Sequence, residues 1–185
     1  MNLEERIRLK SITDEDLFII FKWRNQQSIR NVMINSEIIT WNQHISWYND
    51  YKDNHKSITK IFYFDDIPYG VLNVYDIDCK NQKCKWGFYV GELTAPSGMG
   101  TILGYTSLNY IFENLKIKKL TAEVLSFNEK SLRFHYKLGF TNEGILREHL
   151  LMNNVYKDLY IFVILKEEWD DKKNEILKFL EGRFL

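Results

Sequence analysis

The first third of the chain combines a strand-like pattern with two helix-like ones. Ile7, Leu9 and Ser11 alternate with charged residues, and this alternation over residues 7–12 predicts a first strand. The segment Thr13–Asp16 has the form of a helix N-cap before an apolar helix that continues through residue 23. Residues 40–43 have capping-box spacing and predict the start of a second helix.

Three strand-like segments follow, and short polar turns join them. The segments are Thr59–Phe64, Tyr69–Ile77 and Cys84–Gly91. Residues 65–66 and 80–83 separate them, and connections this short join antiparallel strands.

After residue 100 the pattern alternates between helices and strands. Apolar residues step by three or four from Ile102 to Leu115, which predicts an amphipathic helix beginning near Gly100. The elements expected after it are a strand at Leu120–Leu125, a short helix at Ser131–Leu138 capped by Gly139, two strands around the Asn153–Asn154 turn, the second at Val155–Leu165, and a last helix carrying Trp169 and Phe184. This order predicts an α/β (α+β) fold with a mixed sheet.

Length and composition restrict the classes of protein to consider. At 185 residues, against about 150 per domain, the chain predicts one domain over residues 1–185. The 25 basic residues balance the 25 acidic ones, so charge gives no general attraction to nucleic acid or to an anionic membrane. The longest apolar runs fall far short of the roughly 18 residues of a membrane span, and the charged start does not resemble a secretory signal. We therefore expect a soluble, cytoplasmic protein.

The chain has two cysteines, Cys79 and Cys84, on either side of a predicted turn. On facing strands they could form a strained redox pair or half of a zinc site. No second Cys or His pair stands at ligand spacing, so we expect no metal site. Free cysteines are more commonly buried and inert.

The segment Gly91–Thr101 joins a predicted strand to a predicted helix and holds glycines at positions 98 and 100. Such a turn directs backbone N–H groups and the positive end of the helix dipole into one concavity, which suits a diphosphate. It is not a P-loop, since no Gly-Lys-Ser/Thr follows, and its third glycine, Gly104, comes one residue late for a dinucleotide fingerprint. By itself the segment fits a structural turn as well as an anion site.

Two motifs in succession resemble those of the GNAT acetyltransferase family. The first is Ala95-x-x-Gly98-x-Gly100, and the second is Asn128-x-x-Ser131-x-x-x-x-Tyr136-Lys137-Leu138-Gly139-Phe140. The resemblance implies a single-domain GNAT fold with a mixed, mostly antiparallel seven-stranded sheet and helices on both faces. It also implies an N-acetyltransferase that uses acetyl-CoA and no metal. Ala95 departs from the Gln or Arg that the family prefers, although a cradle of backbone amides needs no side chain there.

The resemblance further implies which residues bind acetyl-CoA. Loop amides would hold the pyrophosphate, a bulged and splayed strand would offer main-chain groups to the pantetheine, and the Asn after the next strand would contact the cofactor arm. The cofactor-binding residues expected are Phe88, Tyr89, Val90, Ala95, Pro96, Ser97, Gly98, Met99, Gly100, Thr101, Asn128 and Ser131.

Amine acetylation needs a neutral amine, a donor for the developing oxyanion and a proton for the leaving thiolate. A backbone N–H of the splayed strand suits the oxyanion. Tyr136 matches the family's general acid, although its position alone also fits a core tyrosine. Glu123 lies where some relatives that acetylate protein N-termini carry a catalytic glutamate, and Glu92 or a water relay is the alternative base. We expect His135 to serve in packing or at the surface.

The acceptor is the second open question, and residues 17–35 bear on it. They include three cations, Lys22, Arg24 and Arg30, and no acid. This pattern suits an anionic acceptor with a flat ring, whereas a polyamine would need carboxylates. Ordinary solvated charges on a helix face are the alternative.

Three short motifs in the same half resemble a particular GNAT subfamily. They are Phe21-Lys22-Trp23-Arg24-Asn25, Ile29-Arg30-x-x-Met33 and His44-x-x-Trp47. The subfamily N-acetylates a UDP-4-amino-4,6-dideoxy sugar in pseudaminic acid synthesis, and the resemblance implies that Arg30, Met33 and His44 line the nucleotide or sugar pocket.

The second half does not discriminate between acceptors. Residues 143–148 and 156–158 are shared with relatives that acetylate ribosomal-protein N-termini or spermidine, so these acceptors are the enzymatic alternative. A non-catalytic module that binds acyl-CoA is a third hypothesis. We expect a small-molecule amine acceptor, with no nucleic-acid or membrane partner. Exposed edge strands near the C-terminal hairpin could support a homodimer.

Overall fold

One mixed sheet of seven strands organises the computed structural model, which describes residues 2–184. The strand order is β1-β2-β3-β4-β5-β7-β6, and β4 with β5 is the one parallel pair among these residues. The strands are β1 Ile7–Ser11, β2 Ile58–Phe64, β3 Ile67–Asp78, β4 Lys83–Val90, β5 Lys119–Leu125, β6 Thr141–Met152 and β7 Val155–Leu165. The mixed, mostly antiparallel sheet expected from the sequence is confirmed.

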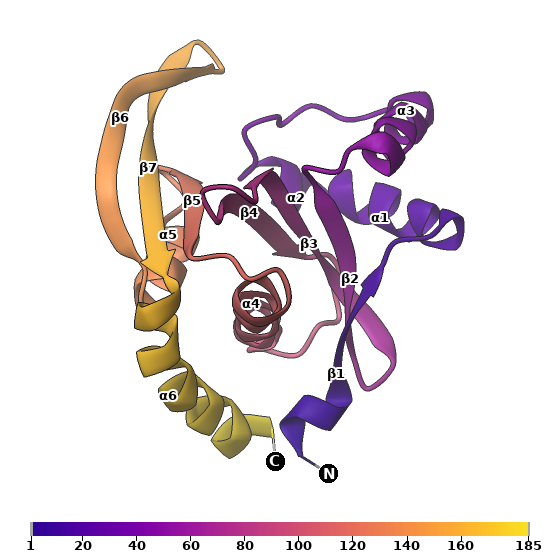
Figure 1. The fold of residues 1–185 in the computed structure, drawn as a ribbon. Coiled ribbons are helices and arrows are strands. Elements are labelled where there is room, and N and C mark those ends of the chain that lie inside the picture. The colour runs from indigo at the N-terminus through magenta and orange to yellow at the C-terminus, as the bar shows by residue number, and fades with distance from the viewer. Residues whose placement is uncertain (1, 185) are drawn as a thin grey trace.

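Helices cover both faces of this sheet, and the sheet lies between two hydrophobic cores (Figure 1). The helices are α1 Leu17–Arg24, α2 Gln27–Arg30, α3 Trp41–Asp53, α4 Met99–Asn109, α5 Glu129–Lys137 and α6 Lys166–Phe184. The larger core lies between the sheet and α4, α5 and α6, whereas α1, α2 and α3 enclose the smaller one. In β2 and β3, neighbouring residues point to opposite cores, as the period of a strand requires: Ile61 and Val71 belong to the smaller core, and Phe62 and Leu72 to the larger one. We call these two sides the α4 face and the α1 face.

Side-chain caps fix the boundaries of two helices that frame the site. Thr40 Oγ1 accepts the Gln43 N–H at 3.3 Å, and Gln43 Oε1 accepts the Thr40 N–H at 2.7 Å, so the capping box before α3 is present. Asn128 Oδ1 accepts the Ser131 N–H at 3.2 Å and begins α5 two residues earlier than the sequence predicts. The helix expected to continue to Leu115 instead ends at Asn109 and gives way to a π-helical turn at Tyr110–Asn114.

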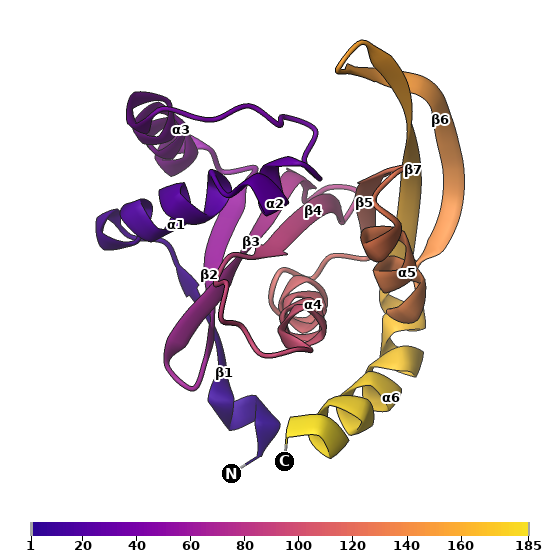
Figure 2. The same cartoon turned by 180° about the vertical axis from the view of Figure 1, so that it is seen from behind.

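The last helix, α6, runs beside α4 and returns the chain towards its start (Figures 1 and 2). At one end, buried Trp169 donates its Nε1–H to Asn109 Oδ1 at 2.9 Å. At the other end, the Phe184 ring packs edge-on against Phe64, and its carbonyl accepts a hydrogen bond from Arg6 at 2.9 Å. The C-terminal end of α6 is therefore held against Arg6, which directly precedes β1, and against the end of β2.

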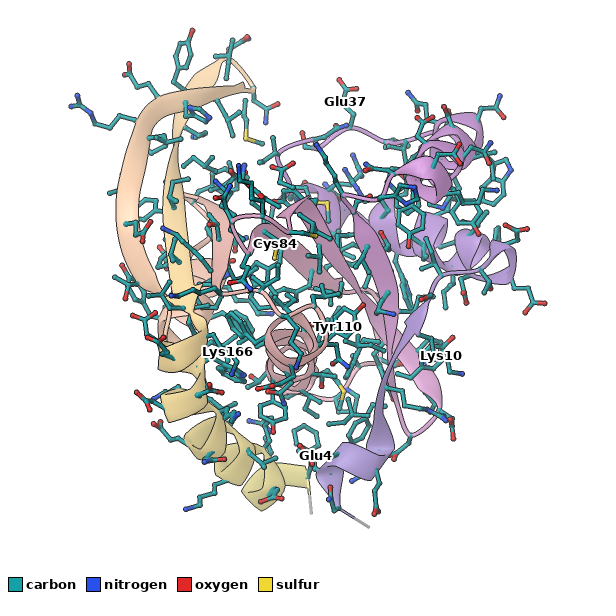
Figure 3. The ribbon with its side chains drawn as sticks, viewed as in Figure 1. Glu4, Lys10, Glu37, Cys84, Tyr110 and Lys166 are labelled. Carbon is teal, nitrogen blue, oxygen red and sulfur yellow. The ribbon has the colours of Figure 1, made fainter. Side chains whose placement is uncertain are left out.

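The remaining sequence expectations concern cysteines, membranes and metals. Cys79 is exposed and Cys84 is buried, the latter in the interior of the molecule (Figure 3). Burial raises the pKa of the Cys84 thiol to about 12, which keeps it protonated and unreactive. No helix within residues 2–184 is both long and apolar enough to cross a membrane. Over the same residues, no three His, Cys, Asp or Glu side chains gather as a metal site would require.

Candidate active site

β4 and β5 separate in the middle of the sheet, where the family resemblance implies a splayed strand. Their pairing ends at Trp86 with Ala122, although β4 continues to Val90 and β5 to Leu125. The edge of β4 beyond Trp86 therefore has no strand partner on the β5 side. Its main-chain groups from residue 88 to residue 90 are available to a ligand that enters the opening.

The glycine loop, residues 91–101, connects this opening to α4. Gly98 caps α4 with φ +107°, a left-handed conformation that favours glycine. The Met99 N–H donates to the Pro96 carbonyl, and the Thr101 and Ile102 N–H groups donate to the Gly98 carbonyl. The N–H groups of residues 97, 98 and 100 donate to no acceptor within residues 2–184.

Free amides at a helix N-terminus suit a diphosphate, so the loop fits the pyrophosphate of CoA. Ala95, Pro96 and Met99 lie on the same loop, and Met99 is buried in the larger core.

Glu92, the alternative base, has its Oε1 within 3.1 Å of the Thr94 N–H and 2.9 Å of Thr94 Oγ1. These hydrogen bonds lower the pKa of the Glu92 carboxyl and tie Glu92 to the turn.

Helix α5 covers the opening on the α4 face. The Phe134 ring packs 5.1 Å from that of Phe88 on β4, and it occupies the space that a Cβ on Gly104 of α4 would need. Asn128 is the N-cap of α5, and Ser131, whose N–H the Asn128 side chain accepts, lies in the first turn of that helix. The structure thus brings both GNAT-like motifs to the same opening.

Tyr136 and His135 point in different directions from α5. Tyr136 is 54 % exposed, and its ring meets Phe162 edge-on at 4.9 Å. Phe162 is paired with Ala122, so Tyr136 lies on the α4 face, level with the point where β4 and β5 separate. His135 is buried among the rings of Trp86, Phe134, Phe140 and Phe162, where packing is its evident role.

A cavity of about 300 Å³ lies on the α1 face, bounded by α1, α3, β3, β4 and the segment between α2 and α3. Its polar and aromatic lining residues are Arg24, Gln43, His44, Trp47, Asn73 and Tyr89. None of the described residues that line it is acidic. Tyr89 follows Phe88 on β4, so the strand that borders the cofactor opening also forms a wall of this cavity.

Arg24 provides the positive charge of the cavity. Its Nη2 donates to the Asn35 carbonyl at 2.6 Å, whereas its Nη1 is buried without a partner in the described part of the chain. Burial lowers the pKa of the guanidinium, and neighbouring Arg30 lowers it further. An arginine remains charged despite such a shift, so Nη1 is a buried cationic donor with no acceptor. An anion in the cavity would supply one.

His44 and Trp47 form a flat aromatic wall beside Arg24. Their rings stack at 5.2 Å with an angle of 20°. His44 Nε2 lies 3.0 Å from the Leu17 carbonyl oxygen, which can only accept, so the neutral ring carries its proton on Nε2 and leaves Nδ1 as an acceptor. Burial lowers the pKa of His44 and favours this neutral form.

The three residues expected in the acceptor pocket are only partly brought together. Met33 and His44 line the cavity, but Arg30 does not. The Arg30 guanidinium donates to the carbonyls of Asn25 at 3.1 Å and Ser36 at 2.9 Å, and it holds the segment between α2 and α3 in place. The sequence gives Arg24 as one of three cations in residues 17–35 and does not distinguish it from the other two. The cation-rich segment was the signal, and tertiary contacts distinguish its members.

Glu123 lies on the α1 face, at the first β5 position beyond the last residue paired with β4. Its carboxylate forms an ion pair with Lys85 of β4 at 2.8 Å, and Lys85 also lies 3.3 Å from Asp76. The hydrogen bond to Glu123 raises the pKa of Lys85. Nearby Tyr75 has its pKa raised to about 12 by burial and by the Glu123 charge. Glu123 thus lies beside Lys85 at the mouth of the opening on the α1 face.

Comparison with known proteins agrees with these features. Residues 9–161 match the family described as "Acetyltransferase (GNAT) domain". The chain is 31 % identical over 139 residues to "Acetyltransferase PseH" of Campylobacter jejuni subsp. jejuni serotype O:23/36 (strain 81-176), an alignment that covers 73 % of this chain and 85 % of that protein. It is 21 % identical over 170 residues to "Spermidine N(1)-acetyltransferase" of Vibrio cholerae serotype O1 (strain ATCC 39315 / El Tor Inaba N16961), covering 90 % and 97 % of the two chains.

Among solved structures, the fold is similar to that of spermidine N-acetyltransferase from Vibrio cholerae in complex with CoA and spermine. The TM-score is 0.82 at 19 % sequence identity, and the match covers 89 % of this chain and 98 % of that one.

Proposed function

This chain belongs to the GNAT acetyltransferase family and is an acetyl-CoA-dependent N-acetyltransferase, and we propose that its acceptor is the 4-amine of a UDP-linked 4-amino-4,6-dideoxy sugar. Arg24 carries this proposal, because its buried Nη1 has no acceptor within residues 2–184 and no carboxylate of these residues lines the cavity. A phosphate of the nucleotide supplies that acceptor. A polyamine, which is itself cationic, would meet only repulsion from Arg24.

The aromatic wall supports the same acceptor. The stacked rings of His44 and Trp47 offer a flat surface to a uracil or sugar ring next to the cation. The cavity volume of about 300 Å³ is at the lower end of small-molecule sites. It therefore suits one part of a nucleotide sugar, with the remaining atoms towards the opening between β4 and β5.

Acetyl-CoA, when bound, supplies an acetyl thioester to which the acceptor amine adds directly. We assign the unpaired β4 edge to the pantetheine and the oxyanion, and the glycine loop to the pyrophosphate. The base is Glu123, at the acceptor-side mouth, and it takes the proton that the amine loses. Tyr136, on the opposite face, donates a proton to the sulfur of the leaving thiolate.

Arg24→Gln tests the acceptor. We expect it to raise the KM for the UDP-4-amino sugar about 10- to 100-fold, the range for losing a hydrogen bond to a charged group, with an unchanged Kd for acetyl-CoA. Free-thiol release from acetyl-CoA gives the rate. Spermidine and a short peptide are run beside the sugar, and free UDP should compete with the sugar.

Lys52→Gln is the matched control, since Lys52 is an exposed cation of α3 that does not line the cavity. It should leave the KM unchanged. Thiol release with spermidine or peptide, and none with the sugar, would reject the proposed acceptor but would leave the assignment as an acetyltransferase intact. If Arg24→Gln raised the KM for an uncharged amine acceptor by the same factor, Arg24 would be rejected as the residue that binds the phosphate.

Tyr136→Phe tests the proposed acid. Because the phenol is exposed, its removal should leave folding and the Kd for acetyl-CoA unchanged, while turnover falls about 100-fold, the lower end of what a positioned acid contributes. Stopped assays for kcat and calorimetry for Kd measure the two quantities. Unchanged turnover would remove Tyr136 from the mechanism.

A further inference from the structure

The glycine loop lacks the positive charge that its proposed ligand calls for. Residues 91–101 contain one acidic residue, Glu92, and no lysine or arginine. CoA carries a pyrophosphate and a 3′-phosphate, and a phosphate monoester alone brings a charge of about −2 at neutral pH. Backbone amides provide only partial charges against such an anion. Any full positive charge beside the loop therefore comes from another part of the chain.

The end of α6 places one such charge on the loop. Arg183 Nη2 donates to Ser97 Oγ at 2.9 Å. The next residue, Phe184, packs so closely on the loop that a Cβ on Gly98 would lie 2.8 Å from its ring, with Arg183 Nε at 3.1 Å. Arg6 fixes this end of the helix through the Phe184 carbonyl, and Arg6 itself is neutralised by Asp65.

A second cation lies near Arg183. Lys137, at the end of α5, has its ammonium 3.9 Å from the centre of the Phe179 ring, one helical turn before Arg183 on α6. No carboxylate forms an ion pair with Lys137 or Arg183 within the described residues. The pKa of Lys137 is lowered, first by burial and then by the charge of Arg183. Two neighbouring cations that form no ion pair within residues 2–184 suit an anion.

We propose that Arg183, with Lys137 beside it, binds a phosphate group of CoA at the outer side of the glycine loop. The C-terminal helix thereby supplies the charge that the loop itself lacks. This inference rests on the proposed assignment of the loop to CoA. It adds a binding residue from α6, which neither of the two motifs contains.

Arg183→Gln removes the charge and keeps a side chain that can still reach Ser97. We expect the Kd for CoA, measured by calorimetry, to rise about tenfold, the lower end for a charged hydrogen bond because Arg183 is exposed. The unfolding temperature should not change. Arg183→Lys, which keeps the charge, should recover part of the affinity. Lys178→Gln, an exposed cation on the same helix, is the matched control and should bind CoA like the unmodified protein.

Titration with 3′-dephospho-CoA identifies which phosphate is bound. If Arg183 contacts the 3′-phosphate, the variant and the unmodified protein bind dephospho-CoA equally, whereas a tenfold difference that persists assigns Arg183 to the pyrophosphate. An unchanged Kd for CoA in Arg183→Gln, or an equal loss in Lys178→Gln, would overturn the proposal. Absence of CoA binding in the unmodified protein would instead contradict the assignment of the loop.

Discussion

Burial has different consequences for the ionisable side chains on the two faces of the sheet. Arg24 stays charged although its Nη1 is buried, because a guanidinium does not lose its proton in a protein. His135 responds to burial in the opposite way and stays neutral. Its Nδ1 donates to the Ser131 carbonyl at 2.8 Å, and burial lowers its pKa to about 4. Arg24 is therefore suited to bind an anion, and His135 to fill a core.

The neutral state of His135 makes the fold sensitive to acid. The folded-state pKa of about 4 lies below the unfolded value of 6.5, so its contribution to stability is present above pH 6.5 and is lost as the pH falls towards 4. Between pH 7 and 4.5 we expect the free energy of unfolding to fall by roughly 2–3 kcal/mol from this residue. Urea unfolding at each pH measures it.

His135→Leu should flatten this pH dependence, because leucine fills the same apolar surroundings without titrating. His44 has a lowered pKa too and remains as a smaller contribution in the variant. An unaltered slope of stability against pH in His135→Leu would contradict the assignment.

At the scale of elements, the sequence could predict the features that depend on neighbouring residues but not those that depend on tertiary contacts. The capping residues at Thr40 and the glycine loop were identifiable because their structure depends on neighbours within a few positions. The splayed strand and the loop's role came from resemblance. The choice between Arg24 and Arg30 was beyond local sequence, because it depends on which guanidinium reaches carbonyls of the folded segment between α2 and α3. The contact of Arg183 with Ser97 joins residues 86 positions apart and has no local signal.

Alanine substitutions at Gly98 and Gly100 test the importance of the left-handed turn in the glycine loop. Gly98→Ala places a Cβ at φ +107° and 2.8 Å from the Phe184 ring, so we expect the free energy of unfolding to fall by about 1–3 kcal/mol and CoA affinity to fall with it. Gly100→Ala meets nothing within 4 Å of the added Cβ and lies in α4, where alanine should preserve or slightly raise stability. Thermal unfolding and calorimetry measure both effects. Equal destabilisation by the two substitutions would contradict the role given to the left-handed turn.

At the scale of the whole molecule, the sheet separates the two proposed substrate sites. The glycine loop and α5 lie on the α4 face, whereas the cavity of Arg24 lies on the α1 face. The opening between β4 and β5 connects the two faces, and Tyr89 and Glu123 border it on the α1 face. Each substrate therefore has its own approach, and neither covers the other's site.

This separation predicts a kinetic mechanism without compulsory order. We expect desulfo-CoA to compete with acetyl-CoA and to be noncompetitive against the acceptor, and free UDP to show the converse pattern. Initial rates over a grid of both substrates measure these patterns. An uncompetitive pattern for either inhibitor would mean that one substrate must bind before the other.

The same separation bears on how such an enzyme can change over time. Substitutions in α1, α3 and the segment before α3 alter the walls of one cavity, while the glycine loop, α5 and the end of α6 keep their contacts on the far side of the sheet. After gene duplication, one copy of the enzyme can therefore acquire specificity for a different amine while it still binds acetyl-CoA. The walls of the proposed acceptor cavity and the proposed binding site of the acetyl donor can therefore change independently, although both adjoin the opening between β4 and β5.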